Sequence, residues 1–403
     1  MLNRLKLLKH TVGGIFLVAG TTIGAAMLAL PVSAGQGGFL PTLLLFLFYW
    51  AFMTFTALLF VEVNLSIKHE NNFISMARHT LGRWGEVVNW VVYLFLLYAL
   101  TTAYIAGSAA DFQYIIQSLT GYSLPGYLEA LPILLLFSFF VYKGAEAVDY
   151  ANRYMFSALI AVFFLLIILI VPYMDPALLT HMNFGHSRLA ISMVATSFGY
   201  HIIIPTLSEY VDHDVKMLKR IILIGSAIPL LLYVVWTAVT LSIIPLEGNM
   251  GIEQGYQLGI KGTDLLLAAV QSPFLVQLCR ALSFLAIITS FLGVSLSLRD
   301  FLSDGLRMQT TGWRKLFLYF LTFLPPVGLI LLNPRIFLTA LELAGAYGVV
   351  FLLGFMPALM VYQGRKKGME SPYRAPGGKT ALILTMGISV CIMALEFYNQ
   401  IFG

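Results

Sequence analysis

Charged residues are scarce in this chain: only 11% of its 403 positions are Asp, Glu, Lys or Arg, whereas a soluble domain carries about 25%. Hydrophobic residues make up 59%. The net charge of +5 does not indicate a nucleic-acid partner, because basic residues mark the cytoplasmic loops of membrane proteins. The composition therefore predicts an integral membrane protein in contact with a lipid bilayer.

Cysteine is nearly absent as well. Cys279 and Cys391 both fall inside apolar runs, so the sequence predicts neither a disulfide nor a cysteine metal site. No phosphate-binding loop, zinc-ligand spacing or low-complexity tract occurs. We expect no cofactor.

Long apolar runs are what the chain has in abundance. Each is long enough to cross a bilayer as a helix, because hydrocarbon offers the backbone no other hydrogen-bonding partner. The sequence therefore predicts an all-α membrane protein with eleven transmembrane helices. The runs are residues 11–34, 40–66, 87–118, 129–146, 150–172, 188–208, 217–244, 273–298, 314–332, 336–362 and 378–400. The largest loop, residues 245–272, is glycine-rich and has one short helix expected from Thr263 to Val270.

The basic residues indicate the orientation. With the N-terminus inside, 20 of the 24 Lys and Arg residues fall in cytoplasmic segments, three fall in outer segments, and Arg280 lies within a run. Such a bias is typical of the inner face of a membrane. We therefore expect a protein of the bacterial cytoplasmic membrane with a cytoplasmic N-terminus and a periplasmic C-terminus.

The first run contains Gly20-Thr21-Thr22-Ile23-Gly24 at its centre. Two glycines and two β-branched threonines weaken a helix, and membrane backbone unwinds only where it is buried or lines a cavity. Freed N–H groups at the end of a half-helix suit a carboxylate. The alternative is a close helix-packing surface, which small residues also provide.

The sixth run carries a second such stretch, Thr196-Ser197-Phe198-Gly199-Tyr200-His201, followed by Pro205. Interrupted helices at corresponding places in two halves point to a transporter built from inverted repeats, with its site at the midplane. The predicted repeats are residues 11–172 and 188–362, and residues 378–400 add an eleventh helix.

Both stretches also resemble a known family. The segment from Gly20 to Leu28 is similar to the signature of the bacterial aromatic amino acid permeases, which are tyrosine- and tryptophan-specific proton symporters. The likeness covers nearly the whole chain and favours the tyrosine-specific members. Three further motifs carry it: Tyr98–Ile105, Thr289–Val294 and Phe323–Pro326. The resemblance implies the LeuT-like five-plus-five fold of the amino acid–polyamine–organocation superfamily, with helices 1 and 6 broken.

Two positions depart from the family pattern. Relatives have glycine where Ala26 stands, and the tyrosine permeases have a fifth-span lysine where this chain reads Leu159. In proton-coupled relatives such a lysine occupies the place that a sodium ion takes in sodium-coupled ones.

An amino acid substrate needs a carboxylate site, an ammonium site and a side-chain pocket. N–H groups around Thr22, Ile23 and Gly24 suit the carboxylate, and carbonyls near Ser197 and Phe198 suit the ammonium. An apolar pocket with a few polar handles would hold an aromatic ring. The predicted substrate-binding residues are Thr21, Thr22, Ile23, Gly24, Tyr98, Thr101, Ser197, Phe198, Gly199, Tyr200, His201 and Phe291.

Four residues are candidates for coupling transport to a cation. Thr289 and Ser290 offer two hydroxyls for sodium, whereas His201 and Glu342 are candidate proton carriers. His201 is equally well explained as a structural imidazole. Arg280 and Glu342 lie at similar depths, so we expect them to pair, either as an outer gate or as a packing ion pair.

The sequence thus predicts a secondary active importer of an aromatic amino acid, tyrosine foremost, by proton symport with alternating access. Sodium-coupled transport, uncoupled transport and a non-transporting amino acid receptor remain the alternatives. A membrane enzyme is disfavoured because no nucleophile–base pair or metal cluster appears. A channel is disfavoured because paired helix breaks, rather than charged rings, interrupt the bundle.

Overall fold

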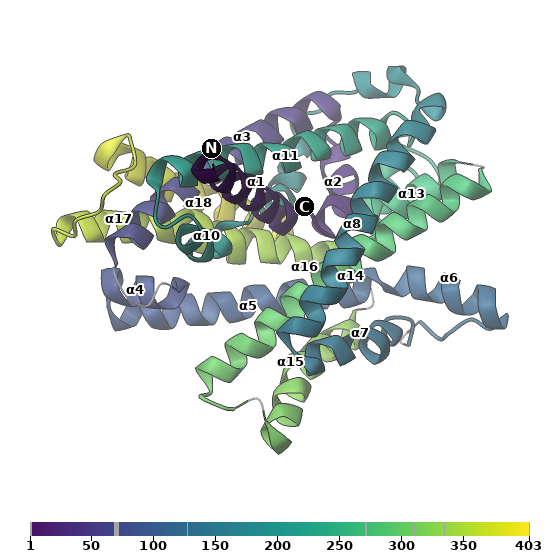
Figure 1. Ribbon diagram of the computed structural model, residues 1–403. Helices are drawn as coiled ribbons and strands as arrows, with labels where there is room; N and C mark the ends of the chain where they lie inside the picture. Colours follow the sequence, from purple (N-terminus) through teal and green to yellow (C-terminus); the bar gives the residue numbers. More distant parts are fainter. Residues whose placement is uncertain are drawn as a thin grey trace.

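The computed structural model describes residues 2–402 apart from 68–71, 127, 271, 310 and 334. Within these residues every regular element is a helix, and no strand occurs (Figure 1). Apolar side chains of nearly all helices join one buried core, which runs along the whole bundle. The predicted all-α membrane protein is therefore confirmed.

Nine helical segments of the described chain are long and apolar enough to cross a membrane, and a tenth span is made of two helices with a bend between them. The bent pair is α1 (Leu2–Thr22) and α2 (Ala26–Gly35). The others are α3 (Phe39–Ser66), α5 with α6 (Arg83–Gly107, Ala109–Thr120), α8 (Ala145–Ile170) with η1 (Val171–Tyr173), η3 (His186–Ala190) with α9 (Ile191–Ser197), η4 (His201–Ile203) and α10 (Ile204–Tyr210), α11 (Val215–Leu241), α14 (Pro273–Gly305), α15 (Gly312–Leu332), α16 (Phe337–Leu343) with η5 (Ala344–Phe355) and α17 (Met356–Lys366), and α18 (Gly378–Phe402).

The fourth predicted span is shorter than expected. Its helix α7 (Leu131–Lys143) has 13 residues, about 20 Å at 1.5 Å per residue, whereas a bilayer core is about 30 Å thick. The helix ends at Gly144, whose φ of 120° suits glycine, and α8 begins directly after it. The described residues therefore give ten full-length spans and one short apolar helix, in place of eleven full-length spans.

Short helices lie between the spans. They are α4 (Phe73–Leu81), η2 (Pro176–Thr180), α12 (Ile252–Leu258) and α13 (Gly262–Ala269). Figure 1 shows α4 and α17 at one end of the bundle and α6 and α13 at the opposite end. The helix expected from Thr263 to Val270 is thus present as α13, but Leu265 and Leu266 are fully buried, so it packs into the protein.

The first span is broken where the sequence predicts. Helix α1 ends at Thr22, α2 begins at Ala26, and the two axes differ by 57°. A Cβ added at Gly24 would lie 2.6 Å from the Ser290 Oγ of α14. Glycine is therefore needed here because another helix approaches the backbone closely.

The sixth span is interrupted more gently. Helix α9 ends at Ser197, Phe198 and Tyr200 have non-helical backbone angles, and a 3₁₀ turn leads into α10. The whole segment still crosses as one span of 25 residues. The predicted interruption of both runs is therefore confirmed, with a large bend in the first only.

The tenth span contains a π-helix of 12 residues, η5. It packs against α9, and a Cβ added at Gly345 would lie 1.9 Å from the Ser192 carbonyl oxygen. π-helical turns are rare and frequently occur at functional sites. Here it lies against the helix that leads into the second interruption.

Candidate functional site

The first helix break leaves backbone donors without acceptors. The Ala25 N–H donates to Ser290 Oγ at 2.9 Å, and Met27 N–H donates to the Gly24 carbonyl at 3.1 Å. Among the described residues, the Gly24 and Ala26 N–H groups donate no hydrogen bond. These N–H groups stand at the positive end of α2, where an anion is stabilised.

Ser290 of α14 lies directly against this break, and Thr289 precedes it on the same helix. Ser290 Oγ accepts from Ala25 N and donates to the Ala286 carbonyl at 2.9 Å. Thr289 Oγ1 donates to the Leu285 carbonyl at 2.8 Å. Both hydroxyl protons are used within α14. The lone pairs of Thr289 Oγ1 remain available to a donor or a cation, whereas Ser290 Oγ already accepts from Ala25 N and lies beside the Tyr104 hydroxyl.

One tyrosine joins the two interrupted spans. The hydroxyl of Tyr233, on α11, lies 2.6 Å from the Thr22 carbonyl oxygen and 3.0 Å from that of Ser197. Both are the last residues of their helices, so their carbonyls lack helical partners. On the same helix Trp236 donates its indole N–H to the Met27 carbonyl at 2.9 Å. Helix α11 thus holds both breaks together.

Phe198 is a predicted aromatic residue whose ring contacts Tyr233 at this junction. Its side chain is fully buried, and its ring packs edge-on against Tyr233, with centroids 5.5 Å apart. Phe46 of α3 completes the cluster, at 6.3 Å from both rings. The three rings form an apolar wall beside the carbonyls of Thr22 and Ser197.

Other predicted aromatic residues face α15. Tyr98 donates its hydroxyl proton to the Leu321 carbonyl at 2.8 Å, and Phe291 stacks on Phe323 with centroids 5.8 Å apart. Thr101 is fully buried and bonds the Leu97 carbonyl of its own helix. The structure does not bring Tyr98 together with Phe198 in one aromatic cluster.

Tyr200 and His201 face α3. The His201 Nε2 lies 2.9 Å from Thr56 Oγ1, and its ring packs against Phe60. Its Nδ1 is buried without a hydrogen-bond partner, and the buried Tyr200 hydroxyl lies beside the Thr54 and Ser226 hydroxyls without a well-aligned hydrogen bond. Both side chains are therefore buried polar groups whose bonding capacity is incompletely used.

The remaining predicted residues offer a substrate mainly their backbone N–H and carbonyl groups. The hydroxyls of Thr21, Thr22 and Ser197 bond carbonyls of their own helices, and the Thr21 side chain is exposed. Ile23 is buried in the core. Gly199 lies against η5, where an added Cβ would be 3.3 Å from Leu353.

The expected pairing of Arg280 with Glu342 is wrong. The Arg280 guanidinium lies 3.5 Å from the ring centroid of Tyr114, and no ion pair joins it to Glu342 within the described chain. Glu342 lies beside the Tyr256 hydroxyl instead, and its Oε1 is buried without a partner. Each of the two charged side chains therefore lies beside a tyrosine and not beside the other charge.

A second buried carboxyl lies near Glu342, and sequence reasoning missed it. Glu396 of α18 accepts from Ser192 Oγ at 2.6 Å and from Gln400 Nε2 at 3.0 Å. Its side chain is 4% exposed, and no cation pairs with it in the described residues. The position near the end of the last apolar run gave no signal of this contact.

The described residues offer few ligands for a metal ion or a cofactor. Among the described residues, no cluster of three His, Cys, Asp or Glu side chains could hold a metal ion. Cys279 is buried, Cys391 is exposed, and both are free thiols. The polar groups of the two breaks are backbone amides, carbonyls and hydroxyls, which suit a small zwitterion or a hard monovalent cation.

A bundle of apolar spans with two interrupted helices joined at mid-length is the architecture of a multi-pass membrane permease. The comparisons with known proteins agree. A sequence model of the tryptophan/tyrosine permease family matches residues 8–396. The chain belongs to this family, whose members are transport permeases and not enzymes.

Several relatives cover almost the whole chain. It is 32% identical to the tyrosine-specific transport system 1 of Haemophilus influenzae, over 97% of both chains. It is also 32% identical to a tryptophan-specific transport protein of Pseudomonas aeruginosa, over 93% of this chain and 91% of the relative. A glutamine transporter 2 of Aliivibrio fischeri is 29% identical over 93% and 96%. The relatives thus share amino acid transport but differ in the side chain transported.

Proposed function

We propose that the protein is a secondary active transporter that imports an aromatic amino acid, with tyrosine as the principal substrate. The observation that carries this proposal is the junction at Tyr233, where the freed carbonyls of both interrupted spans meet beside the N–H groups of the first break. Relatives specific for tyrosine and tryptophan support the aromatic side chain.

The proposed site binds the zwitterion through backbone. The substrate carboxylate accepts from the N–H groups of Gly24 and Ala26, at the positive end of α2. The ammonium donates to the carbonyls of Thr22 and Ser197, which keep lone pairs free beside the Tyr233 hydroxyl. No charged side chain is needed, which agrees with the scarcity of ionisable groups in the spans.

The substrate ring would lie along Phe198, with Phe46 and Tyr233 as further walls. An aromatic pair contributes about 0.5–1.5 kcal/mol beyond simple burial, so this wall favours a ring over an aliphatic side chain. Tyr98, Tyr200 and Phe291 complete the pocket if the spans that carry them close around the bound substrate. The Tyr200 hydroxyl and the unpartnered His201 Nδ1 are polar groups that a phenolic hydroxyl can satisfy.

For the architecture we propose the LeuT-like fold, with residues 11–172 and 188–362 as inverted five-helix repeats and residues 378–400 as an added helix. Helix α7 counts as the short fourth crossing, so the chain crosses eleven times. The distribution of Lys and Arg then puts the N-terminus in the cytoplasm and the C-terminus in the periplasm of a bacterial inner membrane.

For coupling we propose a proton, carried by Glu342. Its Oε1 has no partner, and a second buried carboxyl, Glu396, lies near it without a cation. A buried charge without a partner is costly, so we propose that this carboxyl carries the coupling proton in its neutral form. His201 fits a structural role, because Thr56 and Phe60 surround it and no acid pairs with it among the described residues.

Sodium coupling is the second candidate. Ser290 lies against the first break, the neighbouring Thr289 hydroxyl has its lone pairs free, and Leu159 leaves the place of the family's lysine without a charge. Oxygen ligands of this kind suit a sodium ion. Uncoupled transport and a receptor role have no feature of the structure in their favour.

The proposal is tested by competition for uptake of labelled tyrosine into proteoliposomes. Unlabelled tyrosine, phenylalanine or tryptophan should reduce uptake, and leucine, arginine and glutamate should not. Strong competition by arginine or glutamate would contradict an aromatic specificity. Because a relative is a glutamine transporter, glutamine belongs in the same series, and its competition would contradict the specificity too.

A further inference from the structure

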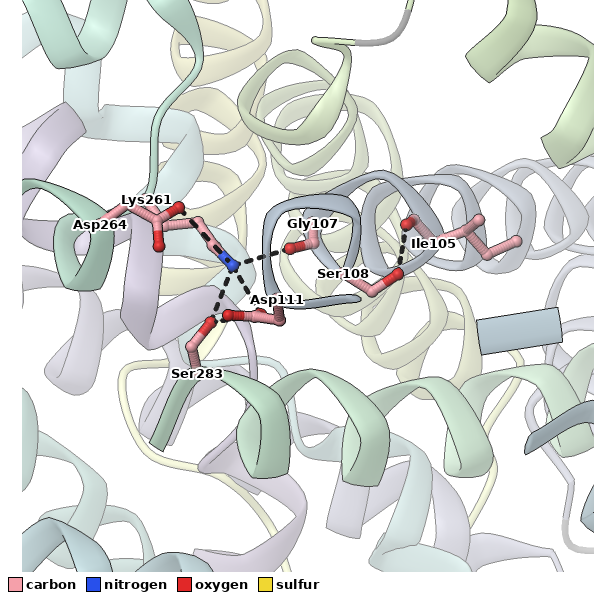
Figure 2. A network of polar contacts seen from close by, with 7 residues as sticks. All are labelled: Ile105, Gly107, Ser108, Asp111, Lys261, Asp264 and Ser283. Carbon is pink, nitrogen blue, oxygen red and sulfur yellow. Dashed lines mark hydrogen bonds and ion pairs between the residues drawn. The ribbon is translucent and has the colours of Figure 1, made fainter. Parts of the chain in front are cut away.

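Lys261 is the only basic residue between α11 and α14, and it is buried, with 3% of its side chain exposed. All three of its ammonium protons have acceptors. Its Nζ lies 2.8 Å from the Gly107 carbonyl, 2.7 Å from Asp111 Oδ2 and 2.8 Å from Ser283 Oγ (Figure 2). A loop lysine is ordinarily solvated, so this burial indicates a specific task.

Two carboxylates balance the ammonium. Asp111 Oδ2 also accepts from Ser283 Oγ at 2.7 Å, and Asp264 lies 3.7 Å from the Lys261 Nζ. Burial by itself lowers the pKa of Lys261, but the carboxylates of Asp111 and Asp264 outweigh it and raise that pKa, so the lysine is charged. Arg280 is the further charged group near this cluster.

The network joins separate spans at one end of the bundle. Gly107 and Asp111 flank the junction of α5 with α6, and Ser283 lies on α14. The next residue after the lysine, Gly262, packs on α2: a Cβ added there would lie 3.0 Å from the Leu28 carbonyl oxygen. Lys261 and Gly262, at the start of α13, thus connect α2, the second half of the broken first span, to α5 and α14.

We propose that Lys261 is a positioning residue for transport, whose contacts with Asp111 and Ser283 hold the substrate site closed on the α6–α13 side. Substrate enters from that side only after Lys261 leaves these partners and α13, together with α2, separates from α14. A buried ion pair suits this task, because the desolvation that it costs offsets much of its attraction, and separation returns both charges to water. This inference rests on the proposed transport function, and the proposed topology makes that side the periplasm.

A native cysteine reports on the opening. Cys279 is one helical turn before Ser283 on α14 and is 1% exposed, so it reacts slowly while the contacts are intact. Cys391→Ser removes the exposed thiol and leaves Cys279 as the single target. The probe is a membrane-impermeant maleimide added from outside to the full-length protein in right-side-out vesicles.

In this background Lys261→Met should raise the rate of Cys279 labelling at least about tenfold, in proportion to the rise in the open population. Lys367→Met makes the same change at an exposed lysine and should leave the rate unchanged. Gly262→Ala keeps the network but crowds the Leu28 carbonyl, so it should raise the rate as well. It also provides the decisive variant if Lys261→Met does not yield monodisperse protein.

Equal labelling rates in the parent, Lys261→Met and Gly262→Ala would overturn the inference. Tyrosine uptake, measured on the same preparations, separates this failure from failure of the proposed function. A parent protein that takes up no aromatic amino acid would refute the function, whatever the labelling shows. A parent that transports tyrosine while its variants label no faster would refute the role of Lys261 alone.

Discussion

The contact between Gly24 and Ser290 gives the sharpest test of the first helix break. A Cβ at position 24 would lie 2.6 Å from Ser290 Oγ, well inside van der Waals contact, with Ser290 Cβ next at 3.8 Å. Gly24→Ala must therefore displace Ser290 or the break. Overpacking of this kind costs about 1–3 kcal/mol. If this energy weakens substrate binding and not folding stability, tyrosine affinity decreases roughly 5–150-fold.

The crowding atom can be removed separately. Ser290→Ala eliminates Oγ and leaves the Ala25 N–H without its acceptor, which costs about 1–3 kcal/mol by itself. In the double variant the nearest remaining atom is 3.8 Å away, an ordinary contact. The losses should therefore not add: Gly24→Ala/Ser290→Ala should bind about as Ser290→Ala does, with a coupling energy of roughly 1–3 kcal/mol.

Equilibrium binding of labelled tyrosine to the purified variants measures the change in affinity, and their melting temperatures measure the change in stability. Gly293→Ala is the matched control on α14, because a Cβ there meets nothing within 4 Å. Gly24→Val should nearly abolish binding, since its branched side chain crowds the N–H donors further. A monodisperse Gly24→Val protein with wild-type affinity would show that the break is not the carboxylate site. Strict additivity in the double variant would show that the two residues do not touch.

Three further predictions concern single side chains. Tyr233→Phe removes the donor shared by the Thr22 and Ser197 carbonyls and should weaken tyrosine binding by about 1–3 kcal/mol, measured by the same binding assay; unchanged affinity would exclude the junction from the site. Glu342→Gln should preserve tyrosine exchange between equal pH values but abolish accumulation driven by a pH gradient, and retained accumulation would exclude Glu342 as the proton carrier. His201→Gln can still bond Thr56 and should keep pH-driven uptake in proteoliposomes, whereas its loss would assign the proton to the imidazole.

Local features of the helices could be predicted from sequence. Gly20 and Gly24, with two threonines between them, identified the first break, because glycine and β-branched residues weaken a helix wherever it lies. The stretch from Ser197 to Tyr200 identified the second interruption in the same way. The length of α7 was misjudged because an apolar run does not reveal that Gly144 ends one helix and begins the next.

Contacts between distant parts of the chain could not be predicted. The Tyr233 hydroxyl meets carbonyls 211 and 36 residues away, and nothing in the seventh run distinguishes that tyrosine from a core or lipid-facing one. The burial of Lys261 could not be read from the sequence, because its acceptors come from two other spans. Arg280 and Glu342 looked like a pair by depth alone, but depth does not say which faces of their helices meet.

Transport under two separately imposed ion gradients decides whether this permease moves an aromatic amino acid together with a cation, as we propose. Purified protein in liposomes is given labelled tyrosine under an imposed inward pH gradient without sodium, and then under an imposed sodium gradient at equal pH. We expect accumulation above equilibrium under the pH gradient alone, absent in empty liposomes. Accumulation driven by sodium at equal pH would assign the coupling to Thr289 and Ser290, and no accumulation under either gradient would contradict active transport of tyrosine.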